Sequence, residues 1–220
     1  MKRLLDLTVS LFGLIALLPY LLVICLIIKI DSKGPIFFRQ ERVGLNGELF
    51  MMWKFRTMIP EASSKGSAIT GSGDDRITRF GRILRLTKVD ELPNLINVLI
   101  GDMSLVGPRP EIPLFIEGLS DSEKVILSVK PGITGPTQLR YISEDEMLGP
   151  VNVDENYVES VLKDKIKSDL RYVNQRTFFR DITLIFTTFF AIGYKLLGRR
   201  TGVMQENDVT EARREMGSGD

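Results

Sequence analysis

The sequence predicts an α+β fold that is mostly helical, with a kinked re-entrant membrane helix at the N-terminus, a small β-hairpin and amphipathic helices at the membrane interface. Three observations predict it. Residues 7–28 carry no charged side chain, strand-forming runs flank a glycine-containing turn at 44–47, and apolar residues recur at helical spacing further along. At 220 residues the chain is long enough for one domain of ordinary size.

The residue composition excludes several kinds of chemistry. The chain has no histidine, which excludes a Ser-His-Asp triad, a histidine zinc site and a histidine general base. The single cysteine, Cys25, excludes an intrachain disulfide and a zinc thiolate cluster. A net charge of +1 argues against a nucleic-acid partner. Carboxylates, Lys, Arg, Tyr, hydroxyl groups or a hard metal ion must therefore carry any reaction.

The apolar run 7–28 predicts a membrane helix about 33 Å long, against a bilayer core of about 30 Å. Pro19 lies within it and should kink the helix, because proline removes a hydrogen bond and clashes with the preceding turn. Basic residues flank the run on both sides. They are Lys2 and Arg3 before it and Lys29, Lys33, Arg39 and Arg42 after it. Since Lys and Arg mark the cytoplasmic side, these flanks favour a re-entrant helix.

Two alternatives remain for this segment. A single membrane-spanning anchor could tolerate a proline at this depth. A secretory signal peptide is disfavoured, because the run exceeds the usual apolar length and no A-x-A-like cleavage site follows it.

The next segment predicts a turn at 31–35 and then a β-hairpin. Strands are expected at 36–38 and 49–55, on either side of the turn at 44–47. Residues 62–75 are rich in Ser, Gly and Thr, which is typical of a surface loop.

Helices account for most of the remaining chain. The helix at 90–100 is expected to begin with Asp90 as N-cap, with Pro93 in its first turn and Gly101 as its stop. The run at 182–194 is too short to span a membrane and predicts a core or interfacial helix. Other helices are predicted at 77–86, 112–129 and 155–166. Residues 106–110 contain two prolines and cannot form a helix interior, and a turn containing Pro and Gly is predicted at 130–136.

The adjacent acids Asp90 and Glu91 are the first candidate for chemistry. At a helix start, unpaired N–H groups and the helix dipole would lower the pKa of Asp90 and leave a ready anion. The same helix end favours a bound phosphate. Ordinary helix capping explains two acids at this position equally well.

Basic residues form the second candidate. Lys54 and Arg56 alternate on a predicted strand, so both should point to one face. Arg109 is held between Pro108 and Pro110, and a helical stripe carries Arg76, Arg79, Arg82 and Arg85. Arginine matches phosphate oxygens bidentately, which suggests a diphosphate ligand. Part of the stripe could instead face anionic lipid or pair with Asp74 and Asp75. Walker A and G-x-G-x-x-G motifs are absent from the sequence.

Seven motifs in order resemble the bacterial sugar transferase family, the monotopic polyprenol-phosphate phosphoglycosyl transferases. The resemblance extends from about Lys2 to about Gly198 and departs from the family pattern at Leu18, before Pro19, and at Pro136. The motifs are Lys54-Phe-Arg-Thr-Met58, Arg76-Ile-Thr-Arg-Phe-Gly81, Leu84-Arg85, Asp90-Glu-Leu-Pro93, Asn97-Val-Leu99, Gly101-Asp-Met-Ser-Leu-Val-Gly-Pro-Arg-Pro110 and Lys130-Pro-Gly-Ile-Thr-Gly135.

The resemblance implies transfer of a sugar-1-phosphate from a nucleotide-diphosphate sugar, expected to be a UDP-sugar, to undecaprenyl phosphate. It implies that Asp90 and Glu91 are the catalytic dyad. Asp90 would form a covalent phosphosugar intermediate and bind Mg²⁺. From the residues and the resemblance together we expect substrate binding by Lys54, Arg56, Arg85, Pro108, Arg109 and Pro110.

The resemblance also implies a place in the cell. We expect a re-entrant helix at 1–30, a catalytic domain at 31–198 on the cytoplasmic face of the bacterial inner membrane, and a polar tail at 199–220. Its partners would be inner-membrane lipids and downstream glycosyltransferases of a glycan pathway, and a homodimer is compatible with it. A catalytically silent membrane scaffold of the same fold is the alternative function.

Overall fold

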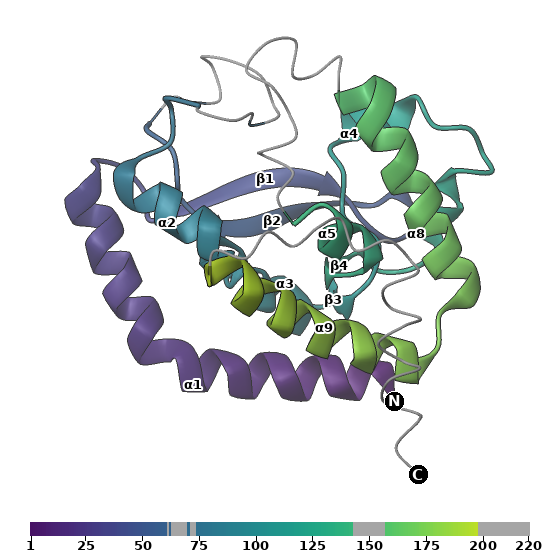
Figure 1. The fold of residues 1–220 in the computed structure, drawn as a ribbon, viewed down its shortest axis with the longest axis horizontal. Helices are drawn as coiled ribbons and strands as arrows, with labels where there is room; N and C mark the ends of the chain where they lie inside the picture. Colours follow the sequence, from purple (N-terminus) through teal and green to yellow (C-terminus); the bar gives the residue numbers. More distant parts are fainter. Residues whose placement is uncertain (61, 63–69, 71–73, 143–156, 198–220) are drawn as a thin grey trace.

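Helix α1 (Lys2–Asp31) is a continuous apolar helix that changes direction part-way along its length (Figure 1). The computed structural model describes residues 1–60, 62, 70, 74–142 and 157–197. Pro19 lies inside the helix and accounts for the bend, as the sequence predicts. Only 6% of the most apolar window of α1 is buried. Of the helices described, this one is long and apolar enough to cross a membrane, and such exposure distinguishes it from a core helix.

The predicted hairpin is confirmed. Strands β1 (Phe37–Val43) and β2 (Leu49–Phe55) pair antiparallel and are joined by the 3₁₀ turn η1 (Leu45–Gly47). Asn46 and Gly47 both have positive φ, which suits the residue types found in such turns. Strand β1 extends to Val43, beyond the predicted 36–38, because its whole length pairs with β2.

Helix α2 (Arg79–Thr87) begins after the cap Thr78, whose hydroxyl accepts from the Gly81 N–H at 2.9 Å. A Cβ added at Gly81 would lie 2.1 Å from the Thr57 carbonyl oxygen, so glycine allows α2 to pack against the chain after β2. The 3₁₀ turn η3 (Val89–Glu91) follows, and then α3 (Asn94–Ile100), which ends at Gly101 with φ 101° as predicted.

The sequence prediction of a turn at 130–136 is wrong. Strand β4 (Gly132–Thr134) pairs parallel with β3 (Ser104–Val106), a contact between segments far apart in the chain. A Cβ at Gly132 would lie 2.0 Å from the Gly107 nitrogen, so glycine permits this close approach. Local turn chemistry cannot reveal such a pairing.

The continuous helix predicted at 112–129 is also wrong. Helix α4 (Pro113–Glu117) is followed by Gly118, and the 3₁₀ turn η4 (Lys124–Ser128) comes after it. Glu123 accepts from the Ser120 N–H at 2.9 Å, which stabilises a separate turn between the two.

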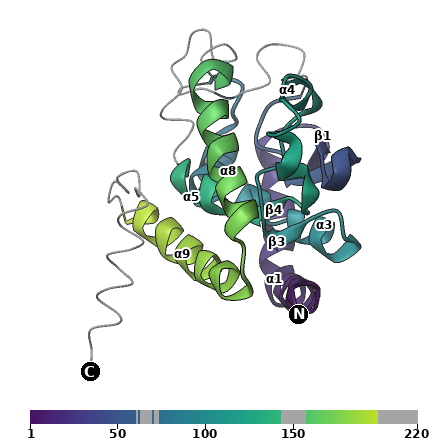
Figure 2. The same ribbon diagram turned by 90° about the vertical axis from the view of Figure 1, so that its right-hand side faces the viewer.

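Three helices complete the described chain. They are α5 (Pro136–Arg140), α8 (Lys163–Gln175), which continues from the π turn η5 (Tyr157–Leu162), and α9 (Phe178–Leu196). Figures 1 and 2 show α9 and the first half of α1 along the same lower side of the molecule. The predicted loop at 62–75 lies largely outside the described residues, as do residues 155–156 and the tail at 199–220.

Three clusters of buried apolar side chains lie among the described residues. The smallest packs Ile28 of α1 against Phe55 and Leu84. The two larger ones form the core of the folded domain. One joins β2, α3 and β3 to α8 through side chains such as Met52, Val98, Val106 and Tyr172. The other lies between α4 and α8, around Phe115, Tyr157 and Ile166. The acidic pair lies next to the first cluster, at the junction of η3 and β2, and is therefore held by rigid elements.

Candidate active site

The acidic pair lies on the 3₁₀ turn η3, between α2 and α3. Lys88 adopts a left-handed conformation with φ 57°, which ends α2 and starts this turn. Asp90 is therefore not the N-cap of the helix, and that prediction is wrong. Pro93 occupies the position before α3 and has helical φ and ψ, so the helix begins one turn later than expected.

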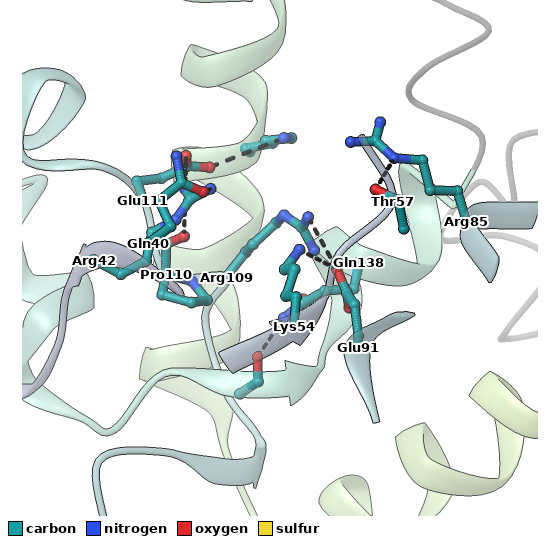
Figure 3. Close-up of polar contacts among 12 residues, drawn as sticks. Gln40, Arg42, Lys54, Thr57, Arg85, Glu91, Arg109, Pro110, Glu111 and Gln138 are labelled. Carbon is teal, nitrogen blue, oxygen red and sulfur yellow. Dashed lines mark hydrogen bonds and ion pairs between the residues drawn. The ribbon is translucent and has the colours of Figure 1, made fainter. Parts of the chain in front are cut away.

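Glu91 accepts contacts from two cations (Figure 3). The Lys54 Nζ lies 2.7 Å from Glu91 Oε1, and the Arg109 Nη2 lies 3.5 Å from the same oxygen. Burial alone would raise the pKa of Glu91, but the positive charges of Lys54 and Arg109 outweigh it and hold the pKa below its usual value. Glu91 is thus ionised throughout the physiological range.

Asp90 has a different environment. Burial raises the pKa of its carboxyl to about 6, and the negative charge of Glu91 adds to that rise. The expectation that a helix end lowers this pKa is wrong. Its Oδ1 is buried and has no hydrogen-bond partner among the described residues. A buried carboxylate oxygen left without a donor is costly unless a ligand satisfies it.

Arg56 does not share the environment of Lys54. Strand β2 ends at Phe55, so the strand alternation that would align the two side chains stops before Arg56. The Arg56 Nη2 donates to the Ser32 carbonyl at 2.6 Å and to the Ser32 Oγ at 2.9 Å. Arg56 therefore fastens the end of α1 to the domain, and the expected common face of Lys54 and Arg56 is wrong.

The arginine stripe divides into separate environments. The Arg85 Nε donates to Thr57 Oγ1 at 2.9 Å (Figure 3). The positive charge of Arg85 also acts to lower the pKa of Asp90. Arg76 pairs with Asp74, with Nη2 and Oδ2 2.6 Å apart, as one of the sequence alternatives anticipated. Arg79 and Arg82 are exposed.

Hydrogen bonds to the carbonyl groups on both sides of Arg109 hold the segment that carries it. The Pro108 carbonyl accepts from the Gly132 N–H at 2.8 Å, and the Pro110 carbonyl accepts from the Arg42 Nη1 at 3.1 Å. The Arg109 N–H itself donates to Asp169 Oδ2 at 3.3 Å. The structure thus brings Lys54, Arg109 and the acidic pair together, with Pro108 and Pro110 as supports for Arg109.

Sequence reasoning missed Asp169, which is buried on α8 and also accepts from Thr137 Oγ1 at 2.5 Å. It also missed three other polar residues near the pair. Arg42 was considered only as a membrane flank, and Asn94 and Gln138 were not considered. The buried oxygens Asn94 Oδ1 and Gln138 Oε1 have no partner among the described residues. The closeness of Asn94 to the acidic pair in sequence was the only available signal.

Asp169 predicts a pH dependence of stability. Burial raises the pKa of this carboxyl to about 7, so the folded protein favours its protonated form. The resulting stabilisation is complete below the unfolded value of about 3.9 and is lost as the pH rises through about 7. Relative to the Asp169→Asn variant, the free energy of unfolding of the wild type should fall by up to about 1.4 kcal/mol per pH unit between these two pH values. Thermal melts of both proteins from pH 4 to pH 8 measure the difference, and parallel curves would contradict it.

The described residues contain no group of three or more His, Cys, Asp or Glu side chains suited to hold a metal ion. Mg²⁺ is commonly bound by one or two carboxylates, with water and substrate phosphates completing its ligands. The unpartnered Asp90 Oδ1 fits such a site, because a hard cation would satisfy that oxygen.

Taken together, the described residues form a site in which a carboxylate with an unpaired oxygen lies beside a second carboxylate held by two cations. Such an arrangement can bind an anionic phosphate and present a carboxylate nucleophile to its phosphorus.

The sequence is similar to those of several known proteins. Residues 1–195 match the family described as bacterial sugar transferase. The chain is 36% identical to the uncharacterized sugar transferase EpsL of Bacillus subtilis over 220 residues, which cover all of this chain and 98% of that protein. It is 40% identical to an undecaprenyl-phosphate glucose phosphotransferase of Komagataeibacter xylinus, over 85% of this chain and 35% of that protein.

A third relative is the UDP-glucose:undecaprenyl-phosphate glucose-1-phosphate transferase of Caulobacter vibrioides. It is 37% identical over 85% of this chain and 67% of its own length. With a family match over nearly the whole described chain, the protein belongs to the bacterial sugar transferase family.

Proposed function

We propose that the protein transfers a sugar-1-phosphate from a UDP-sugar to undecaprenyl phosphate, releasing UMP and forming undecaprenyl-diphospho-sugar. The observation that carries this proposal is the unequal acidic pair. Glu91 is held by Lys54 and Arg109, whereas Asp90 keeps a buried oxygen with no partner among the described residues. Family membership and the names of the relatives agree with it.

In the proposed first step, an oxygen of the Asp90 carboxylate attacks the phosphorus that bears the sugar. The phosphoanhydride bond breaks and UMP leaves with the bonding electron pair. In the second step, an oxygen of undecaprenyl phosphate attacks the same phosphorus and the Asp90 carboxylate is released. Dividing the transfer in this way lets one nucleophile serve a water-soluble donor and a membrane-bound acceptor in turn.

Three cations would bind the phosphates in this scheme. Lys54 and Arg109 already converge on Glu91, and Arg85 lies near Asp90. Both substrates are anionic, so these charges would offset the repulsion between phosphate and carboxylate. Mg²⁺ held at Asp90 would supply further charge neutralisation on the phosphate oxygens.

We also propose that α1 is re-entrant, because both of its ends are fastened to the same folded domain. At its start, the Lys2 Nζ donates to the Val106 carbonyl at 2.8 Å, and the Arg3 Nη1 donates to the Val98 carbonyl at 2.6 Å. At its end, Arg56 binds Ser32. A straight span would place these ends on opposite sides of a layer about 40 Å thick, which is incompatible with one domain holding both.

Helix α9 supports the same placement of the domain on the membrane surface. Its backbone lies along the same lower side of the molecule as the first half of α1 (Figures 1 and 2), and several of its aromatic side chains are exposed. Phe179, Phe186, Phe189 and Phe190 are all more than half exposed. Aromatic side chains exposed on an amphipathic helix suit the interface between lipid and water.

Cysteine labelling tests this topology. In a Cys25→Ala background, a cysteine inserted after Met1 and one at Lys33→Cys should both resist a membrane-impermeant maleimide in intact cells. Both should react in inverted membrane vesicles, because the two ends lie on the cytoplasmic side. A periplasmic cysteine reporter serves as control. Labelling of either position in intact cells would rule out the re-entrant arrangement.

The function is tested by measuring UMP release from UDP-sugars by the purified full-length protein with undecaprenyl phosphate and Mg²⁺. We expect UMP and undecaprenyl-diphospho-sugar in equal amounts with at least one donor. A donor panel that yields neither product, with a correctly folded protein, would favour the silent scaffold.

A further inference from the structure

Two buried asparagines one turn apart on α3 have different roles. Asn97 is fully paired: its Oδ1 accepts from the Trp53 N–H at 3.0 Å, and its Nδ2 donates to the Met51 carbonyl at 2.9 Å. Asn94 is equally buried, 2% exposed, yet its Oδ1 has no partner among the described residues. The hydrogen bonds of Asn97 therefore explain its burial. Burying Asn94 Oδ1 costs free energy of folding that no hydrogen bond among the described residues offsets.

Asn94 lines a small recess beside the acidic pair. Glu91, Arg109 and Arg42 line the same recess, and side chains such as Met52 and Met103 complete its wall. Arg42 brings a second unsatisfied group. Its Nη1 and Nη2 donate to Pro110 and Gln40, but its buried Nε has no partner among the described residues. The recess is about the size of one water molecule.

We propose that this recess binds one hydroxyl group of the sugar in the UDP-sugar donor, with Asn94 Oδ1 accepting from that hydroxyl and Arg42 donating to it. This inference rests on the proposed function and identifies two further donor-binding residues. A hydroxyl group both donates and accepts, so it can satisfy an orphaned acceptor and an orphaned donor together.

Two other parts of the donor fit the recess less well. A phosphate oxygen only accepts, so it would leave Asn94 Oδ1 unsatisfied, and a nucleobase is too large for a recess of this size. The sugar is the favoured source of the hydroxyl, because Glu91 of the acidic pair forms part of the wall. The sugar is the part of the donor attached to the phosphorus that meets this pair.

The Asn94→Leu variant should lose donor affinity without losing folding stability. Leucine has a similar volume and no polar atoms, so the melting temperature without ligand should stay the same or rise. Asn97→Leu is the matched control and should lower it, because the Trp53 N–H and the Met51 carbonyl lose their partners.

Binding is measured by calorimetry in an Asp90→Asn background, so that the donor is not cleaved. The donor is whichever of UDP-glucose, UDP-galactose and their N-acetylamino counterparts binds most tightly. Asn94→Leu should weaken its binding roughly 10- to 100-fold and leave UDP binding unchanged. Equal weakening of donor and UDP would assign the recess to the nucleotide and overturn the proposal. Unchanged binding of both would overturn it as well.

Donor analogues test the same hydrogen bonds without altering Asn94. Against the Asp90→Asn protein, one of the singly deoxygenated sugars should bind as weakly as the intact donor binds after Asn94→Leu. The same analogue should bind the protein carrying Asn94→Leu almost as tightly as it binds the protein with Asn94, because the hydrogen bond is already lost. If every deoxygenated donor binds like the intact one, no sugar hydroxyl occupies the recess. Failure of the proposed function is seen separately, as the absence of UMP release from a wild type that binds the donor.

Discussion

The Asp90→Asn variant is expected to release no UMP and to form no covalent adduct with the donor. An amide cannot displace UMP to give an acyl phosphate, so the loss in turnover should be about 10⁴-fold or more. Intact-protein mass spectrometry after incubation with UDP-sugar and Mg²⁺, without lipid, measures the adduct. The wild type should gain the mass of a sugar phosphate, and peptide mapping should place it on Asp90.

Two controls make this result specific. Because burial raises the pKa of Asp90 to about 6, the protein loses stability as the pH rises from the unfolded value of about 3.9 to about 6, and the full loss remains above pH 6. At pH 8 the Asp90→Asn protein should therefore melt at the same temperature as the wild type or higher. Glu91→Gln should slow turnover strongly but still allow slow labelling by the donor. An adduct that persists in Asp90→Asn, or maps to Glu91, would reverse the assigned roles.

The Arg109→Ala variant is expected to lose about 2–5 kcal/mol of transition-state stabilisation, measured from kcat/KM for UMP release. The Arg109 guanidinium lies 3.5 Å from Glu91 and is only partly exposed, so its charge is weakly screened by solvent. Folding should change little. Glu91 keeps its 2.7 Å contact with Lys54, and alanine retains the backbone N–H that donates to Asp169.

Arg82→Ala is the matched control for this loss, because Arg82 is an exposed arginine of the same protein on α2. In detergent solution its kcat/KM should remain within about twofold of the wild type. If Arg109→Ala instead lowers the melting temperature sharply while the folded fraction keeps full activity, Arg109 is a structural residue.

Features that depend on a few neighbouring residues were predictable from the sequence. The hairpin follows from strand-forming runs around a turn with Asn46 and Gly47, and α3 ends at Gly101 because glycine adopts positive φ at little cost. The bend in α1 follows from Pro19. The acidic pair and Arg109 were likewise found as residue types in motifs, since chemistry of this kind requires carboxylates and arginines.

Features that depend on long-range contacts were not predictable. The pairing of β3 with β4 joins residues 104–106 to 132–134, and nothing in either segment alone indicates it. Arg56 occurs within the same short motif as Lys54, yet it binds the end of α1, 24 residues earlier in the chain. Strand alternation could not predict this, because β2 stops one residue before Arg56.

The pKa values of the acidic pair also depend on long-range contacts and not on the neighbouring sequence. Asp90 and Glu91 are adjacent in the chain, and their pKa values are shifted in opposite directions. Glu91 pairs with Lys54 from β2 and with Arg109 from the segment after β3. Asp90 is buried, and its Oδ1 has no partner in the part of the chain that the structure describes. The chain itself supplies two ordinary carboxyl groups. Burial and the partners brought by distant segments make them unequal, because desolvation and charge pairing arise only once those segments have packed together.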